Sequence, residues 1–407
     1  MSHDAAELAA RASYGKLVAY LATWSRDVAA AEDALGDAFL EAVDTWPRIG
    51  VPRRPEAWLL TVARRRLVDG ARHAKVEDVA AAALRVVMDG VLQEASAKDV
   101  FPDERLKLLF VCAHPAIDPA ARTPLMLQTV LGLDAARIAS AFLVSPAAIG
   151  QQLVRVKGKI RDAGIVFEMP DRNELPSRLE PVLEAIYAAY GSGWEDVAGA
   201  DPRRRGLAGE AIWLGRLVTS LLPGEPEAEG LVALMLHCEA RREARRDADG
   251  NYVPLATQDV SRWSRTMLEE AEARLAAASS ANRPGRFQLE AAIQSVHARR
   301  GATGHTDWEA IALLYEGLIR LAPTIGARVG QAAALAEARG AEAGLEALGA
   351  LPPEAIHAYQ PYWALSAHLL KRLGRHPEAA AAYARAIGLS EEPAVRRFLA
   401  GQIPPVA

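Results

Sequence analysis

Helical periodicity runs through almost the whole sequence and leaves little room for any other secondary structure. Apolar residues recur at spacings of three and four, whereas the strict alternation of apolar and polar residues that marks a half-buried strand is absent. In the first part of the chain, the pattern covers residues 4–20, 29–44, 55–72, 77–93, 103–110, 120–131, 135–141 and 146–161. Aromatic residues make up only 6%, which also favours helix over strand. We therefore predict an all-α protein.

The chain is too long for one ordinary domain, because 407 residues correspond to about two to four domains. Residues 74–102 carry a loose apolar pattern typical of a connector, and prolines break the pattern again between residues 167 and 176. Beyond residue 176, helical segments alternate with glycine and proline turns. Gly340 and Gly374 are 34 residues apart, the period of tetratricopeptide (TPR) hairpins. We therefore expect a TPR-like C-terminal part.

Several functional classes are disfavoured by composition. No apolar run approaches the roughly 18–20 residues that span a bilayer, and the first residues lack a signal-peptide pattern. Cys112 and Cys238 are the only cysteines, too few for a disulfide framework, so we expect a cytoplasmic protein without a membrane partner. The sequence also lacks zinc-ligand spacing, a nucleotide-binding glycine loop and a nucleophile–base pair. We expect no metal, no cofactor and no catalysis.

Two stretches concentrate positive charge although the chain carries a net charge of −4. The first, between residues 48 and 75, contains only two acids against the following basic residues: Arg48, Arg53, Arg54, Arg64, Arg65, Arg66, Arg72 and Lys75. The second, between residues 135 and 161, has no acid and contains Arg137, Arg155, Lys157, Lys159 and Arg161. Two separate basic segments predict a bipartite nucleic-acid binder, with solvated helix faces as the plainer alternative.

The second basic stretch has the pattern of a helix-turn-helix. A short helix is expected at 135–141, and Ser145 followed by Pro146 is a strong start signal for the next helix. The expected buried seam consists of Ile138, Ala139, Phe142, Ile149, Leu153 and Val156, which leaves Ala147, Gly150, Gln151, Gln152 and Arg155 pointing outward. Such a helix fits the major groove of a duplex, while Lys157 and Lys159 reach phosphates. An ordinary helical hairpin is the alternative.

The first basic stretch combines a helix with a stiff loop. Along the helix at 55–73, Arg65, Asp69 and Arg72 share one polar face, where Asp69 can hold an arginine in place. The preceding segment 46–54 is expected to be a loop because it contains two prolines, and it carries three arginines.

These motifs together resemble a known family. Residues 31–40 (AEDALGDAFL), followed by Trp58-Leu59, Val62-Ala63 and the segment from Asp69 to Arg72, resemble region 2 of bacterial extracytoplasmic-function (ECF) sigma factors. The helix-turn-helix resembles their region 4. Residues 103–116, 139–144 and 159–165 are similar to a subgroup with a long TPR-like C-terminal extension. Shorter motifs extend the resemblance over residues 212–216, 221–228, 247–250, 258–263 and 288–293.

The resemblance implies an organisation and partners. Residues 1–75 correspond to region 2, 76–102 to a linker, 103–168 to region 4, and 176–407 to a TPR-like regulatory domain. The implied partners are promoter DNA and the RNA polymerase core, through the clamp of its largest subunit and the flap. A protein or a small molecule is expected to regulate the C-terminal domain.

The resemblance also implies site residues. For the −10 promoter element these are Arg48, Ile49, Arg53, Arg54, Arg64, Arg65, Asp69 and Arg72. For the −35 element they are Ala147, Gly150, Gln151, Gln152, Arg155, Lys157 and Lys159. For polymerase they are Glu32, Asp33, Asp37, Phe39 and Leu40, on an acidic helix face that continues to Glu41 and Asp44.

The sequence departs from the family pattern at three positions. Arg65 stands where many relatives have Asn, Gln152 stands where Arg is common, and Gly150 costs a helix roughly 1 kcal/mol relative to Ala. Gly150 and Gln152 favour the alternative of a sigma-derived regulator that binds DNA or a protein without supporting initiation. An enzyme built on the C-terminal half is a third alternative that no catalytic pattern supports.

Overall fold

The computed structural model describes residues 2–73, 104–130, 132–142, 144–171, 173–195 and 207–404. Within these ranges every regular element is a helix, apart from an isolated antiparallel bridge between Arg246 and Tyr252. The predicted all-α fold is therefore confirmed for the described part. The expected linker at 76–102 and helix at 77–93 lie outside these ranges. No helix in the described ranges has the length and apolar character needed to cross a membrane.

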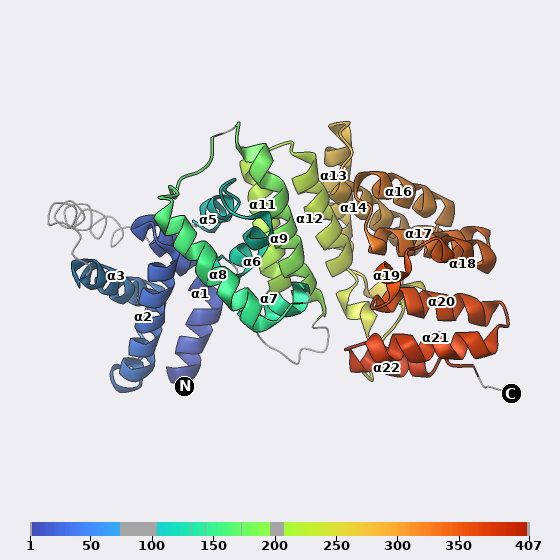
Figure 1. The fold of residues 1–407 in the computed structure, drawn as a ribbon, viewed down its shortest axis with the longest axis horizontal. Coiled ribbons are helices and arrows are strands. Elements are labelled where there is room, and N and C mark those ends of the chain that lie inside the picture. Colours follow the sequence, from blue (N-terminus) through green and yellow to red (C-terminus); the bar gives the residue numbers. More distant parts are fainter. Residues whose placement is uncertain are drawn as a thin grey trace. The chain divides into compact units, whose positions relative to one another are not determined.

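The chain divides into two compact units (Figure 1), one formed by Met1–Gly193 with Pro202–Leu214 and the other by Trp194–Asp201 with Gly215–Ala407. The first begins with three helices packed on one another: α1 (Ser2–Ser25), α2 (Val28–Ile49) and α3 (Pro55–His73). Helix α2 starts because the carboxylate of Asp27 accepts a hydrogen bond from the backbone N–H of Ala30 at 3.1 Å. Small residues line its buried face, which lets its neighbours approach closely.

The expected loop at 46–54 is shorter than predicted. Helix α2 continues through Pro47 to Ile49 and ends at Gly50, whose φ of 85° suits glycine. Trp46 holds this last turn in place, because its side chain is 1% exposed and its ring meets Trp58 of α3 edge-on at 5.5 Å. Only the turn at 50–54 is left outside the two helices.

A second group of helices follows in the same unit: α5 (Arg105–Cys112), α6 (Pro119–Thr129), α7 (Ala135–Phe142) and α8 (Pro146–Asp162). As predicted, Ser145 caps α8, and its Oγ accepts a hydrogen bond from the N–H of Ala148 at 3.2 Å. The predicted seam is also confirmed where side chains are described, because Ile138, Ala139, Ile149, Leu153 and Val156 are all buried. Helices α7 and α8 pack against each other through this seam.

The first unit extends beyond the boundary that the sequence analysis places at residue 176. It includes most of α9 (Leu175–Glu195) and the first half of α11 (Leu207–Leu221). Arg105 of α5 connects to α11, because its Nη1 lies 2.6 Å from a carboxylate oxygen of Glu210 and its guanidinium lies 4.3 Å from the ring centroid of Trp213. A side chain of α5 is thus paired with α11, beyond residue 176.

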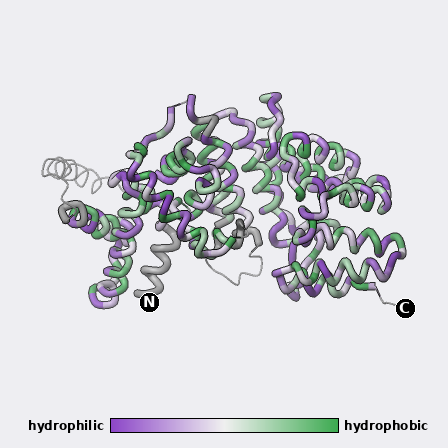
Figure 2. Tube along the Cα trace, viewed as in Figure 1, coloured by the Kyte–Doolittle hydropathy of each residue, from purple (hydrophilic) through white to green (hydrophobic). Residues whose placement is uncertain are grey.

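The second unit consists of short helices that follow one another in space as they do in sequence (Figure 1). They are α12 (Pro226–Glu239), η1 (Arg242–Arg245), η2 (Leu255–Thr257), η3 (Val260–Arg262), α13 (Arg265–Ser280), α14 (Arg286–Ala298), α15 (Arg300–Thr303), α16 (Trp308–Leu321), α17 (Ile325–Arg339), α18 (Ala341–Gly349), α19 (Pro353–Ile356), α20 (Gln360–Arg372), α21 (His376–Leu389) and α22 (Pro393–Ala400). Hydrophobic and hydrophilic residues are interspersed along these helices (Figure 2). Among the described residues from α14 to α22, buried apolar side chains form successive clusters.

The two glycines that suggested a period both lie in turns after helices. Gly340 follows α17 with a φ of 104°, and Gly374 follows α20 with a φ of 73°. These conformations strain any residue with a Cβ atom, which explains glycine at both positions. Neighbouring helices pack as pairs, α16 with α17 and α20 with α21. The assignment as TPR-like repeats stays a prediction.

Candidate nucleic-acid interface

The exposed face of α3 carries Arg65, one of the residues expected at the −10 element. The Arg65 side chain is 83% exposed, and its Nε lies 4.0 Å from the carboxylate of Asp69 one helical turn later. An exposed pair at this distance contributes only about 0–1 kcal/mol, so the guanidinium is free to exchange this partner for a phosphate. The predicted shared face of Arg65 and Asp69 is therefore present. The side chain of Arg72 lies outside the described part of the chain.

Arg64 corrects the predicted −10 surface. Arg64 is only 4% exposed. Its guanidinium donates a hydrogen bond to the hydroxyl of Tyr20 and lies 4.9 Å from the centroid of the Tyr20 ring. The helix turns Arg64 inward because it follows Leu60, which is also buried, by four residues. Arg64 therefore holds α3 against α1 and is not on the surface that is open to DNA.

The turn between α2 and α3 presents apolar and basic side chains together. Ile49 is 68% exposed and Val51 is 42% exposed, and Arg53 and Arg54 follow directly, both exposed. Exposed apolar side chains beside arginines suit an unstacked base held next to its phosphates. The predicted residues Ile49, at the end of α2, and Arg53 and Arg54, in the turn that follows, thus lie close together along the chain.

The acidic face of α2 differs along its length. Asp33 and Asp37 are exposed, Leu40 is 70% exposed and Phe39 is half-buried, so four of the residues expected to contact polymerase reach the surface. An exposed apolar side chain among acids suits a basic protein partner.

Further along α2, arginines neutralise the acids. The Nη2 of Arg48 lies 3.0 Å from the carboxylate of Asp44, and the Nη2 of Arg66 of α3 lies 3.0 Å from that of Glu41. Arg48, expected at the −10 element, is paired within its own helix, but both side chains are exposed, so this contact is weak and Arg48 can exchange it for a phosphate as Arg65 can. The acidic face of α2 is least neutralised near Asp33 and Asp37.

Glu32 and Lys157 lie apart from the surfaces predicted for them. Lys157 of α8 forms an ion pair with Glu32 of α2, and its Nζ lies 2.6 Å from the side-chain oxygen of Gln128. Their side chains are only 10% and 15% exposed. Burial raises the pKa of Glu32, and the nearby Lys157 opposes that shift. In this structure Lys157 is directed at α2 and does not share the exposed face of α8.

The exposed face of α8 consists of residues spaced by three and four positions. Ala147, Gln151, Arg155 and Lys159 are exposed, as the sequence analysis predicted. Gly150 and Gln152 are half-buried. The Nε of Arg155 donates to the backbone oxygen of Gln151 at 3.3 Å, which keeps the guanidinium near the start of the helix.

The sequence analysis missed Val154 on the same face. It is 73% exposed, more than any other large hydrophobic residue in the described ranges. Its position in the sequence could have revealed it. Val154 follows Gln151 by three residues and Ala147 by seven, and this spacing places it on the same outward face of a helix.

Cys112 has no role at a surface. It is fully buried, its Sγ lies 3.7 Å from the hydroxyl of Thr129, and burial raises the pKa of its thiol to about 12. Such a thiol is a packing group. Within the described residues, no cluster of three or more potential metal ligands is found.

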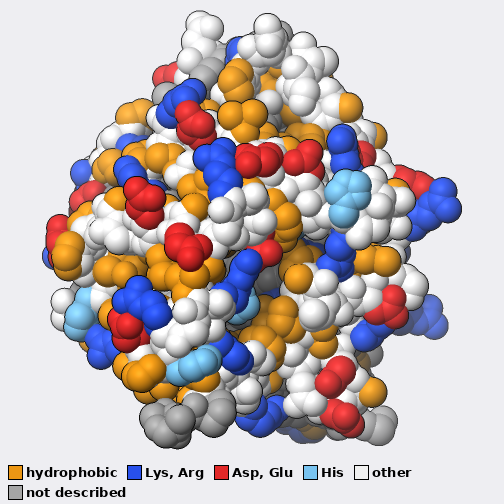
Figure 3. Space-filling model, turned by 90° about the vertical axis from the view of Figure 1, so that its right-hand side faces the viewer, with side chains coloured by type: hydrophobic (Ala, Val, Ile, Leu, Met, Phe, Trp, Pro, Cys, Tyr) orange, Lys and Arg blue, Asp and Glu red, His pale blue; other side chains and the backbone are white. Residues whose placement is uncertain are grey.

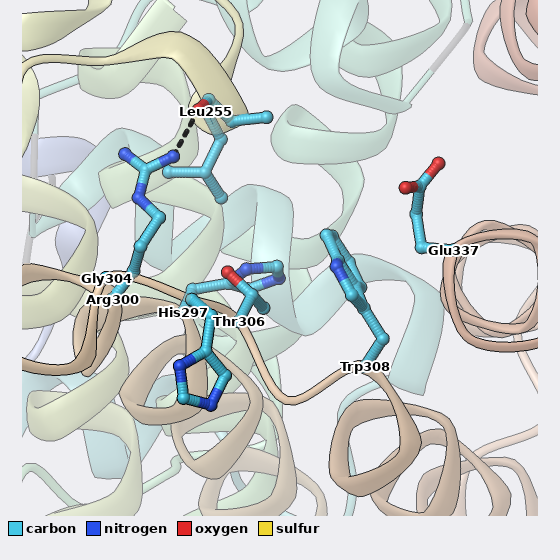
Figure 4. Close-up of a pocket in the computed structure, with 9 residues that line it drawn as sticks. Leu255, His297, Arg300, Gly304, Thr306, Trp308 and Glu337 are labelled. Carbon is cyan, nitrogen blue, oxygen red and sulfur yellow. Dashed lines mark hydrogen bonds between the residues drawn. The ribbon is translucent and has the colours of Figure 1, made fainter.

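A separate cavity of about 220 Å³ lies within the second unit (Figure 4). Its lining includes His297 of α14 and Trp308 of α16, whose rings meet edge-on at 5.3 Å. Burial, together with the charges of Arg241 and Arg300, lowers the pKa of His297 to about 4, so the imidazole is neutral near pH 7.

Arg300 and Glu337, which line this cavity, both have partners within the protein. Arg300 donates hydrogen bonds to the backbone oxygens of Ala256 and Gln258, the second at 2.9 Å, and Figure 4 marks the first. Glu337 pairs with Arg372. On the face shown in Figure 3, acidic, basic and hydrophobic side chains are interspersed, and no charge of one sign dominates. The candidate nucleic-acid surfaces described above, on α3, the turn before it and α8, lie in the first unit.

Comparison with known proteins assigns two parts of the chain. Residues 10–76 match Sigma-70 region 2, and residues 178–279 match a family of unknown function (DUF6596). An uncharacterized protein of Rhizobium meliloti (strain 1021) is 38% identical to the chain over 388 residues, which covers 94% of this chain and 91% of that protein. No solved structure matches the chain. The surfaces of α2 and α3 described above lie within the Sigma-70 region 2 match.

Proposed function

The chain belongs to the same family as this Rhizobium meliloti protein, and from its match to Sigma-70 region 2 we propose that it is an ECF-type sigma factor. Its Sigma-70 region 2 implies a sigma-factor-like role in transcription and binding to the RNA polymerase core, and sigma factors of this kind are not enzymes. The proposal adds that the chain recognises −10 and −35 promoter elements and initiates transcription, and that its C-terminal helices regulate this activity.

One observation carries the proposal: the region 2 helices present two exposed surfaces of opposite charge. Asp33 and Asp37 lie on α2, whereas Arg53, Arg54 and Arg65 lie on α3 and the turn before it. A single surface of either sign is common on soluble domains. Two such surfaces on three helices suit a protein that binds a basic polymerase surface on one side and DNA on the other.

The exposed face of α8 supports a second DNA contact. Gln151 offers an amide that matches the edge of adenine, while Arg155 and Lys159 supply positive charge. The buried seam with α7 fixes this helix from behind. We propose that α8 reads the −35 element as a duplex and that the region 2 surface engages the melted −10 element.

The C-terminal helices are proposed as the regulatory part. Residues 178–279 belong to a family of unknown function, so their role rests on the organisation of the chain. Helices packed in sequence order form an extended surface suited to a regulator, which is either a peptide or a small molecule.

Transcription by purified core polymerase on a pool of genomic fragments tests the proposal, with sequencing of the transcript 5′ ends. We expect defined start sites with the full-length chain and none with core polymerase alone. Specific DNA binding without transcripts would instead support the sigma-derived regulator. Loss of both binding and transcripts would reject the proposal.

A further inference from the structure

The outward face of α8 contains an open apolar hollow. It has a volume of about 410 Å³ and is lined by Gly150, Gln151, Val154 and Arg155. Val154 is the one large aliphatic side chain in this lining, and it is 73% exposed. At Gly150, an added Cβ atom would meet nothing within 4 Å, so the hollow is open on that side.

Packing within the protein does not explain Val154. The apolar residues that hold α8 in place are Ile149, Leu153, Val156 and Ile160, each at most 6% exposed. Valine is also a weaker helix former than alanine, because its branched side chain loses rotamers in a helix. At an exposed position of a helix, valine therefore lowers stability slightly and gains nothing from the core.

The surroundings of the hollow indicate what covers it. Gln151, Arg155 and Lys159 are exposed on the same face, and no acid occurs between Pro146 and Arg161. This charge pattern matches a polyanion. In the major groove of duplex DNA, the apolar group that a side chain can meet is the 5-methyl of thymine, and an amide such as that of Gln151 pairs with adenine.

We propose that Val154 is a specificity residue that receives a thymine 5-methyl group in the hollow beside Gln151. The inference rests on the proposed function, because it requires α8 to lie in the major groove. It adds that α8 selects A·T pairs through two kinds of contact, a hydrogen-bonded one at Gln151 and an apolar one at Val154.

The test removes one methyl group at a time from the DNA. The full-length chain, together with core polymerase, first selects bound duplexes from a random-sequence pool. Each thymine of the selected site is then replaced by deoxyuridine, which lacks only the 5-methyl group. At one or two positions we expect wild-type affinity to fall about fourfold, the value of one buried methyl group.

The variant Val154→Ala identifies the contact. We expect its affinity for the thymine duplex to be about fourfold lower than that of the wild type. For the deoxyuridine duplex, we expect the variant and the wild type to have the same affinity. The matched control is Val166→Ala, which truncates a valine that is 49% exposed outside α8 and leaves the methyl effect unchanged. Both variants should keep the wild-type circular dichroism because both residues lie at the surface.

Two results would overturn the proposal in different ways. If the duplex is bound specifically but V154A responds to deoxyuridine as strongly as the wild type does, the methyl contact is wrong and the proposed function stands. If no sequence is selected from the pool, DNA reading by α8 is wrong, and the contact falls with it. Loss of polymerase binding in V154A without any methyl effect would assign the hollow to a protein and also reject the contact.

Discussion

The Nζ of Lys157 and the carboxylate of Glu32 form an ion pair that connects α8 to α2. Sequence alone assigned these residues to different partners, Lys157 to DNA phosphate and Glu32 to polymerase. Because both side chains are mostly buried and Gln128 also accepts a hydrogen bond from Lys157, the pair holds two helices of the first unit together. Neither charge is available to an outside partner in this conformation.

Lys157 and Lys159 therefore allow a matched comparison, because only Lys159 is expected to contact DNA. Lys159→Ala should reduce the slope of log affinity against log salt by about one, because it removes a phosphate contact. Lys157→Ala should leave that slope unchanged but lower the free energy of unfolding by about 3–5 kcal/mol, because it leaves Glu32 buried without its cation. Salt titrations and urea unfolding of both variants check this. Equal slopes for the two variants would show that Lys157 reaches DNA.

Arg65→Ala should impair promoter opening while leaving the fold intact. The side chain is 83% exposed and its contact with Asp69 is weak, so unfolding midpoints should match the wild type. Permanganate reactivity of the −10 region should fall at least about tenfold, consistent with the loss of a charge-assisted contact of about 1.5–3 kcal/mol. Arg328→Ala, at an exposed arginine of the second unit, is the control. Wild-type footprints from the Arg65 variant would remove this residue from the −10 surface.

Charge reversal on α2 should separate polymerase binding from folding. Asp33→Arg or Asp37→Arg places a cation where the polymerase surface is expected to be basic, and both positions are exposed. Co-purification with core polymerase should be lost while circular dichroism stays the same. Glu168→Arg reverses an exposed charge elsewhere in the same unit and should co-purify normally. Retention of the α2 variants would place the docking surface elsewhere.

His237 makes the second unit sensitive to acid. Burial lowers its pKa to about 4, its side chain is 1% exposed, and neither ring nitrogen has a hydrogen-bond partner among the described residues. The unfolded chain therefore binds a proton first, near pH 6.5, so stability is full above that pH and declines as the pH falls toward 4. The decline from His237 is at most about 1.4 kcal/mol per pH unit.

Urea unfolding at pH 7 and at pH 5 measures this decline. His237→Phe removes the titrating group and should flatten the pH dependence, although His297, whose pKa is also lowered to about 4, retains part of it. A variant with the wild-type pH dependence would show that His237 is not the group responsible.

The pairing of Arg105 with α11 predicts where the chain tolerates truncation. The Arg105 side chain is 6% exposed, and a chain that ends at Pro176 loses both Glu210 and Trp213. Removing the carboxylate and the ring that contact a buried arginine is destabilising, so this fragment should unfold at lower urea than a fragment that ends at Leu222. Proteolysis midpoints of the two fragments compare them. Similar midpoints would show that residues 177–222 add nothing to the first unit.

The sequence predicted the helices well, but it predicted less well which side chains at the edge of a buried helix face are themselves buried. Ser145 was identified as a cap because the cap depends only on local residues, and the seam from Ile149 to Val156 follows from period alone. Arg64 and Lys157 were assigned to the surface because they are charged. Each follows a buried leucine by four residues, so both lie at the edge of the buried face of their helix. At such a position, a partner from another helix decides whether the charged side chain is buried or exposed.

The segment 46–54 shows a second limit. Two prolines and a glycine are typical of a loop, and local pattern could not reveal that Trp46 meets Trp58, which extends α2 by a turn. The role of Arg105 was invisible for the same reason. Its partners lie 105 and 108 positions further along the chain, a separation that periodicity does not reach.

The contact between Arg105 and α11 also constrains how this architecture arose. A gene fusion that joined an unrelated extension at residue 176 would have brought neither the carboxylate of Glu210 nor the ring of Trp213 to Arg105. The packing of Arg105 therefore depends on the segment that carries these two residues. Among relatives, we expect any split of the gene into two to fall after this segment, so that the smaller product keeps it.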